Sequence, residues 1–148
     1  MILCDVGVLV SAGMRESPHH SPCRSAIVEM MAAGQPFAVS EIVLAAVVRI
    51  STNPKIWKTP ATPGSAFAFV NTLRAHSRAV TIAPGGRHWR IFEDLVGQLG
   101  IRGSDTTDAY LAALAQEHGC DWWTIDRGFS RFPGLRWRYL LVSPKRAR

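Results

Sequence analysis

The sequence lacks the features that several common classes of protein require. It contains no apolar run of about 18 residues, so no membrane-spanning helix is predicted and we expect no membrane association. The acid Asp5 interrupts the apolar start and no basic residue precedes it, which argues against a signal peptide and favours a cytoplasmic protein. Cys4, Cys23 and Cys120 are too few and too widely spaced for a disulfide framework or a zinc knuckle, so we expect buried thiols.

Lysine is scarce although the chain is basic. Of 17 basic residues, 14 are arginine and only Lys55, Lys58 and Lys145 are lysine. The 17 basic residues outnumber the 11 acids and give a net charge of +6. Arginine presents a planar fork of donors that suits phosphate, and the excess positive charge favours a polyanionic partner. A genome-wide preference for arginine over lysine explains the same bias equally well.

The length and composition predict one folded domain. With 148 residues, of which 47% are hydrophobic, the chain can bury a substantial core. We expect this domain to span residues 1–142 and to be followed by a short basic tail at 143–148.

Signals for strands and helices alternate along the chain. Apolar segments bounded by turn residues predict strands at 1–5, 36–39, 79–82, 120–125 and 135–142. Apolar residues at helical spacing predict helices from a Ser21 N-cap and Pro22 to Gly34, from a Ser40 N-cap over 42–50, around 66–73, and over 89–99 and 104–118. This alternation predicts an α/β fold, with a mostly parallel central sheet of four to five strands and helices on both faces.

The few acids follow a pattern. Asp5 and Asp126 each come at the end of a predicted buried strand, and ligands of open α/β sheets bind beyond the carboxyl ends of strands. Asp108 lies in the first turn of the predicted helix before the second of these strands, and Asp105 shares its face three residues earlier. Glu41 follows a further strand. We therefore expect four or five carboxylates to meet at one end of the sheet.

Such a cluster suits a divalent metal ion. Neighbouring carboxylates repel one another, and a bound cation relieves that repulsion. Oxygen ligands without histidine or cysteine favour Mg²⁺ or Mn²⁺, and Mg²⁺ held in this way meets substrate phosphates in phosphodiester hydrolysis. Each acid also has a structural interpretation, as a turn residue or as a favourable charge at a helix start.

Five short motifs occur in the order and at the spacing of one known family. They are Met1–Val10, Arg49–Pro54, Asp108–Ala115, Thr124–Phe129 and Arg131–Leu135. Through them the chain resembles the PIN-domain ribonuclease toxins of the VapC type, over nearly its whole length. The resemblance implies a three-layer α/β/α fold and Mg²⁺- or Mn²⁺-dependent endonucleolytic cleavage of RNA, often tRNA or rRNA. It also implies inhibition by a VapB-type antitoxin, and a homodimer.

The resemblance assigns roles to the acids by position. Asp5 and Asp108 match the principal metal ligands of the family, and Asp126 matches the last acid of its site. Glu41 is expected to assist catalysis, directly or through water, and Asp105 is a further candidate acid.

Two positions depart from the family pattern. Many members have Asn, Ser or Thr where Gly7 stands, and a Glu where Ala46 stands. Glycine has no side chain with which to support a metal ligand. These departures leave open a catalytically weakened domain that only binds an antitoxin or RNA. A DNA-directed nuclease of the same fold is a second alternative.

Basic and aromatic residues supply candidates for binding. Lys55, Trp57 and Lys58 lie in the proline-rich segment 51–64, and together with Arg127 they are candidates for contact with nucleic acid or antitoxin. Basic and aromatic residues also alternate near the C-terminus, where an RNA-binding patch and a solvated edge strand are equally good interpretations. These residues are Arg131, Arg136, Trp137, Arg138 and Tyr139.

Overall fold

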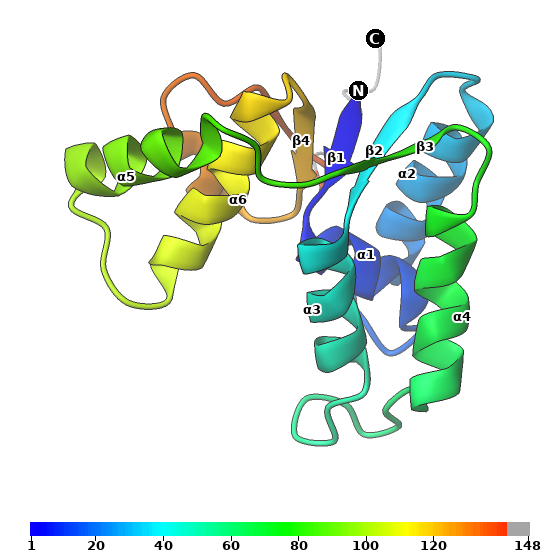
Figure 1. Ribbon diagram of the computed structural model, residues 1–148. Coiled ribbons are helices and arrows are strands. Elements are labelled where there is room, and N and C mark those ends of the chain that lie inside the picture. The colour runs from blue at the N-terminus through cyan, green and yellow to red at the C-terminus, as the bar shows by residue number, and fades with distance from the viewer. Residues whose placement is uncertain (142–148) are drawn as a thin grey trace, which may run out of the picture.

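The protein folds around one parallel β-sheet, as the computed structural model shows for residues 1–141 (Figure 1). Its five strands lie in the order β3-β2-β1-β4-β5, and every neighbouring pair is parallel. The strands are β1 (Ile2–Cys4), β2 (Phe37–Ser40), β3 (Ala79–Ile82), β4 (Asp121–Thr124) and β5 (Trp137–Tyr139). The predicted α/β fold with a parallel sheet is therefore confirmed. The predicted basic tail lies outside the described residues.

Helices cover both faces of the sheet. Because parallel crossovers are right-handed, the chain leaves helices on one face while it runs from β1 to β3 and on the other when it returns to β4. Figure 1 shows α5 and α6 set apart from α1–α4 in this way. The helices are α1 (Val6–Gly13), α2 (His20–Ala32), α3 (Glu41–Ser51), α4 (Pro63–Arg74), α5 (His88–Leu99), α6 (Asp105–Glu117) and the 3₁₀ helix η1 (Arg127–Arg131).

The core lies where the central strands meet α1 and α6. Phe37, Leu3 and Trp122 are fully buried on the three middle strands, and α6 contributes an unbroken buried run from Leu111 to Ala115. Small alanine side chains in that run let α6 approach the sheet closely, which matters because its first turn carries Asp108. The three cysteines are free and buried, as predicted.

The predicted start of the helix that corresponds to α2 is wrong. Helix α2 begins at His20 with His19 at its N-cap, rather than at Ser21 followed by Pro22. A turn through Ser17, whose carbonyl accepts the His20 N–H at 3.1 Å, starts the helix early. Pro22 is tolerated at the third helical position because N–H groups of the first turn have no partner within the helix.

Other elements lie close to their predicted bounds. The strand expected at 135–142 is shorter, since β5 covers Trp137–Tyr139. The apolar run 6–12, for which the pattern gave no assignment, forms α1. No helix within residues 1–141 has the length and apolar character needed to cross a bilayer.

Candidate active site

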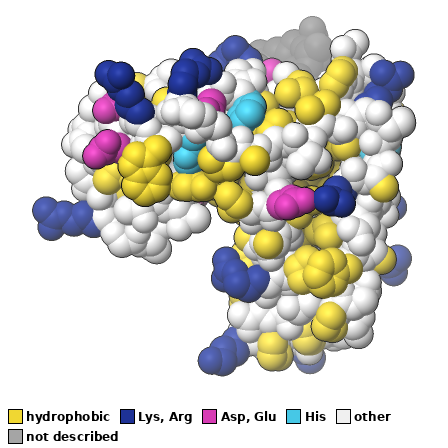
Figure 2. All heavy atoms as spheres, viewed as in Figure 1, with side chains coloured by type: hydrophobic (Ala, Val, Ile, Leu, Met, Phe, Trp, Pro, Cys, Tyr) yellow, Lys and Arg dark blue, Asp and Glu magenta, His cyan; other side chains and the backbone are white. Residues whose placement is uncertain are grey.

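The acids gather where the order of the strands changes direction. Helix α1 leaves β1 toward one face of the sheet, and α6 enters β4 from the other, so the gap between these strands is a topological switch point. Asp5 follows β1 directly, and Asp126 lies two residues beyond the end of β4. Figure 2 shows a hollow in the molecular surface between the α5–α6 and α3–α4 helix pairs. Basic side chains are spread around the outline of the molecule in this view.

The hydroxyl of Thr124 joins two of these acids. It donates to Asp5 Oδ2 at 2.6 Å and accepts the backbone N–H of Asp126 at 2.9 Å. The Asp5 N–H donates to the Trp123 carbonyl at 2.8 Å, so the backbone hydrogen bonds between β1 and β4 continue as far as Asp5. Asp126 Oδ1 accepts the N–H of Gly128 at 2.7 Å. Both carboxylates are thus held by bonds to the end of one strand and the turn after it.

Burial and neighbouring charges set the protonation of the cluster. Burial raises the pKa of Asp5 from 3.8 to about 6, and the charges of Asp108 and Asp126 act in the same direction against the Thr124 hydrogen bond. Burial also raises the pKa of Asp108, against the opposing effect of Arg131, while Asp126 and Asp105 add to the rise. The charges of Asp5, Asp108 and Asp126 therefore act on one another, and the structure places these three predicted residues at the same end of the sheet.

Arg131 is a neighbour of the site that the sequence analysis did not place there. Its Nη2 lies 3.2 Å from Asp108 Oδ2, and its Nη1 lies 3.5 Å from Asp105 Oδ2. Asp105 and Asp108 do share a face of α6, as their spacing predicts, and one guanidinium bridges both. The signal available in the sequence was the short distance from Asp126 to Arg131 along the chain.

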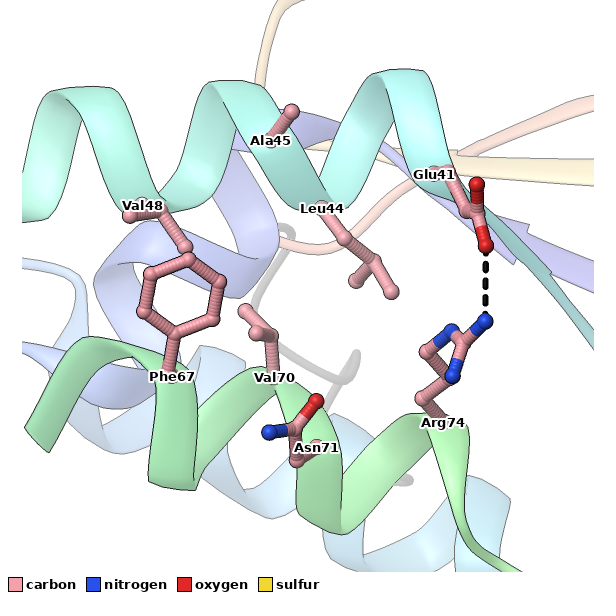
Figure 3. Close-up of a pocket in the computed structure, with 8 residues that line it drawn as sticks. All are labelled: Glu41, Leu44, Ala45, Val48, Phe67, Val70, Asn71 and Arg74. Atoms are coloured by element: carbon pink, nitrogen blue, oxygen red, sulfur yellow. Dashed lines mark hydrogen bonds and ion pairs between the residues drawn. The ribbon is translucent and has the colours of Figure 1, made fainter. Parts of the chain in front are cut away.

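Glu41 has a different partner. It opens α3, and its Oε1 accepts a hydrogen bond from Arg74 Nη2 at 2.7 Å (Figure 3). The pair closes one end of a groove of about 370 Å³ between α3 and α4, whose floor is apolar. The structure therefore does not join Glu41 to the three aspartates through any hydrogen bond, and its catalytic role stays a prediction.

The candidate contact residues lie in two separate places. Lys55, Trp57 and Lys58 belong to the loop between α3 and α4, at the far end of α3 from Glu41 (Figure 1). Trp57 Nε1 donates to the Ile50 carbonyl at 2.9 Å, so this side chain helps to close the loop. The loop is consequently remote from the aspartates.

Arg127 stands next to the acids instead. It follows Asp126 directly, and its guanidinium lies 4.0 Å from the ring centre of Tyr139 on β5. Stacking of this kind leaves the edge of the guanidinium free for hydrogen bonds.

Ser40 is a further polar residue at this edge of the sheet. Leu3 pairs with Ala38, so the same register, continued by two residues, brings Ser40 opposite Asp5. Ser40 occupies the N-cap position of α3, as predicted, but its side chain makes no capping bond. Within the described residues its buried hydroxyl has no hydrogen-bond partner at all.

The donor chemistry of this site fits a hard divalent cation. Three mutually repelling carboxylates without a histidine or cysteine among them suit Mg²⁺ or Mn²⁺. Within residues 1–141, however, no three Asp, Glu, His or Cys side chains are grouped so that they could hold a metal ion as they stand.

Two substitutions compare a hydroxyl that makes hydrogen bonds with one that makes none. Thr124→Val removes a hydroxyl with two partners, and we expect it to lower the free energy of unfolding by about 1–3 kcal/mol. Ser40→Ala removes a buried hydroxyl without a partner, and we expect stability to stay the same or to rise by about 1 kcal/mol. Urea denaturation measures both values. Equal losses in the two variants would contradict this account of the site.

The raised pKa of Asp5 predicts that the stability of the folded protein depends on pH. Between its ordinary 3.8 and about 6, the folded protein binds this proton more tightly than the unfolded chain does. The free energy of unfolding should therefore fall as pH rises through this window, by about 3 kcal/mol for Asp5 alone. Asp5→Asn cannot ionise, so its stability gain over the parent should be absent near pH 4 and complete above pH 7.

Thermal and urea unfolding in EDTA at several pH values would measure that gain. Asp94→Asn, on the exposed surface of α5, is the matched control. A gain for Asp5→Asn that is the same at all pH values would show that Asp5 carries no such cost.

Comparisons with known proteins agree with this arrangement. The sequence matches the PIN domain family over residues 2–135. It is 36% identical to Ribonuclease VapC43 of Mycobacterium tuberculosis over 141 residues, which covers 95% of this chain and 96% of that protein.

Two solved structures have the same fold. One is the structure of VapBC2 from Rickettsia felis bound to a DNA fragment from its promoter, on which the chain superimposes with a TM-score of 0.66 and 19% identity. The superposition covers 94% of this chain and 98% of the matched chain. The chain also superimposes on Mycobacterium tuberculosis VapC20, a Sarcin-Ricin loop cleaving toxin, with a TM-score of 0.65, 16% identity and coverage of 92% and 99%. Motif order, fold and relatives together show that the chain belongs to the PIN-domain family of VapC ribonucleases.

Proposed function

We propose that this protein is a metal-dependent endoribonuclease and the toxin of a toxin–antitoxin pair. The observation that carries the proposal is the meeting of Asp5, Asp108 and Asp126 at the switch point of the sheet. Burial and, to a lesser extent, their mutual repulsion raise the pKa values of Asp5 and Asp108, and a bound cation would stabilise the ionised carboxylates.

The three aspartates would hold Mg²⁺ or Mn²⁺, with Glu41 assisting. When bound, such an ion activates water and neutralises charge on a phosphodiester. The chain supplies the rest. Thr124 fixes the Asp5 carboxylate by its 2.6 Å hydrogen bond, and the N–H of Gly128 fixes Asp126. Preorganised oxygens of this kind need not reorganise during the reaction.

Features of the relatives support the substrate and partner. A relative at 36% identity is named a ribonuclease, and VapC20 is described as a Sarcin-Ricin loop cleaving toxin. The net charge of +6 suits an RNA substrate. The VapBC2 complex supports a VapB-type antitoxin as partner. A homodimer and a cytoplasmic location remain our predictions for this chain.

Cleavage of total cellular RNA tests the proposal. Antitoxin-free protein should produce discrete fragments with Mg²⁺ or Mn²⁺ and none in EDTA. Asp5→Asn should lower the rate by at least about a hundredfold, because the amide removes the negative charge and leaves only one neutral oxygen as a ligand. Asp94→Asn should cleave at the parental rate.

The same digestion distinguishes the alternatives. Preferential cutting of single-stranded or duplex DNA over tRNA and rRNA would indicate a DNA-directed nuclease. A folded parent that cuts no nucleic acid with either metal would contradict the enzymatic proposal and favour a binding domain.

Gly7→Asn tests whether the chain is a weakened enzyme. Gly7 lies in the first turn of α1, and a Cβ there would meet the Ile125 side chain at 3.5 Å, an ordinary contact distance. The position can therefore accept a side chain, and Asn should raise the cleavage rate by about tenfold. An unchanged rate in single-turnover assays would show that Gly7 does not limit the reaction.

A further inference from the structure

Arg131 forms the only ion pairs that the described residues make with Asp108 and Asp105. Both contacts are longer than the other arginine–carboxylate pairs within residues 1–141. The Arg136–Asp121 and Arg74–Glu41 pairs are both 2.7 Å long, whereas Arg131 lies 3.2 Å and 3.5 Å from its two partners. One guanidinium is thus shared loosely between two carboxylates.

A structural role explains this arrangement poorly. The Arg131 side chain is 35% exposed and that of Asp105 is 57% exposed, and ion pairs in contact with water stabilise a fold very little. Stability does not require such a contact at the mouth of a site. What the contact does achieve is charge balance, since it offsets the repulsion that Asp126 and Asp105 impose on Asp108.

A divalent cation would compete for the same carboxylate. Asp108 Oδ2, which faces Arg131, belongs to one of the predicted metal ligands. If Asp108 held a cation, the Arg131 guanidinium would keep only its 3.5 Å contact with Asp105 and would remain beside the site. Arg131 ends η1, five residues after Asp126, and its guanidinium already lies 5.0 Å from the ring centre of Phe132.

The released guanidinium has the right chemistry for the substrate. Its planar fork binds a phosphate through two parallel hydrogen bonds, whereas lysine offers a point charge. Arg127, stacked on Tyr139 at the other end of η1, would add a second cation beside the acids. This short 3₁₀ helix thus brings two arginines to the edge where a phosphodiester must lie.

We infer that Arg131 is a positioning residue that exchanges Asp108 for a phosphate of the RNA when a divalent cation binds. The inference rests on the proposed function. In the metal-free protein Arg131 balances the acids, and in the loaded protein it contacts the substrate. Removal of Arg131 therefore has two opposite effects: metal binding becomes tighter and RNA cleavage becomes weaker.

Calorimetric titration of the antitoxin-free protein with Mn²⁺ tests the first effect without RNA. Arg131→Ala should bind Mn²⁺ about two- to fivefold more tightly, which is the strength expected of an exposed ion pair. Arg136→Ala removes the same charge from a pair with Asp121, at the start of β4 and away from the acids. Its Mn²⁺ affinity should equal that of the parent.

Cleavage of a fluorescent single-stranded RNA at several salt concentrations tests the second effect. Arg131→Ala should lower kcat/KM, mostly through a raised KM. It should also reduce the slope of log(kcat/KM) against log[salt] by about 0.7, as expected for one lost phosphate contact. Arg131→Lys, which keeps the charge without the fork, should restore the slope but only part of kcat/KM.

The outcomes separate this inference from the proposed function. Tighter Mn²⁺ binding together with a lower kcat/KM supports the exchange. Unchanged or weaker Mn²⁺ binding in Arg131→Ala, or tighter binding with unchanged kcat/KM, overturns it while the parent still cleaves RNA. A folded parent that neither binds Mn²⁺ nor cleaves RNA overturns the proposed function, and the exchange with it.

Discussion

The structure depends on the confinement of like charges at the end of a parallel sheet. Asp5 follows the central strand β1, and within residues 1–141 its carboxylate is stabilised by the Thr124 hydroxyl and the neighbouring backbone. Burial of a carboxylate beside Asp108 and Asp126 costs stability, and the fold offsets that cost with its apolar core. Proteins keep such costly arrangements chiefly where a reaction or a ligand needs them, as shifted pKa values at functional sites illustrate.

The sheet order is what creates this confinement. Because β1 and β4 are neighbours although they are far apart in sequence, their carboxyl ends deliver Asp5, Thr124 and Asp126 to one place. Helix α6 then brings Asp108 from the opposite face, and its alanine-rich surface allows close approach. Basic residues provide the complement, with Arg131 bound to the acids and Arg127 stacked beside them. The aspartates, which attract a cation, and the arginines of η1, which attract a polyanion, therefore lie side by side.

The backbone of this arrangement could be predicted from the sequence, because strands and helices leave periodic signals. Asp5 and Asp126 could be singled out as candidates because each acid comes at the end of an apolar segment in a chain with only 11 acids. Asp108 could be singled out because it lies in the first turn of the helix that precedes β4. The partners of charged side chains could not be predicted in the same way. Arg131 reaches Asp108 across the fold, and Arg74 reaches Glu41 across two helices, so neither pair has a fixed spacing. The wrong start of α2 has a similar origin, because a turn at Ser17 overrode the local cap at Ser21.

The central claim is that the Asp5 carboxylate is destabilised by burial and by the neighbouring charges of Asp108 and Asp126, and that a bound cation would relieve this cost. Carbon-13 NMR of the aspartate carboxyl groups measures this directly, with Asp5→Asn used to assign the Asp5 signal. The account predicts a titration midpoint of about 6 for Asp5 in the metal-free protein, and a marked shift of that midpoint to lower pH with Mg²⁺. A midpoint near 3.8 that Mg²⁺ leaves unchanged would contradict it.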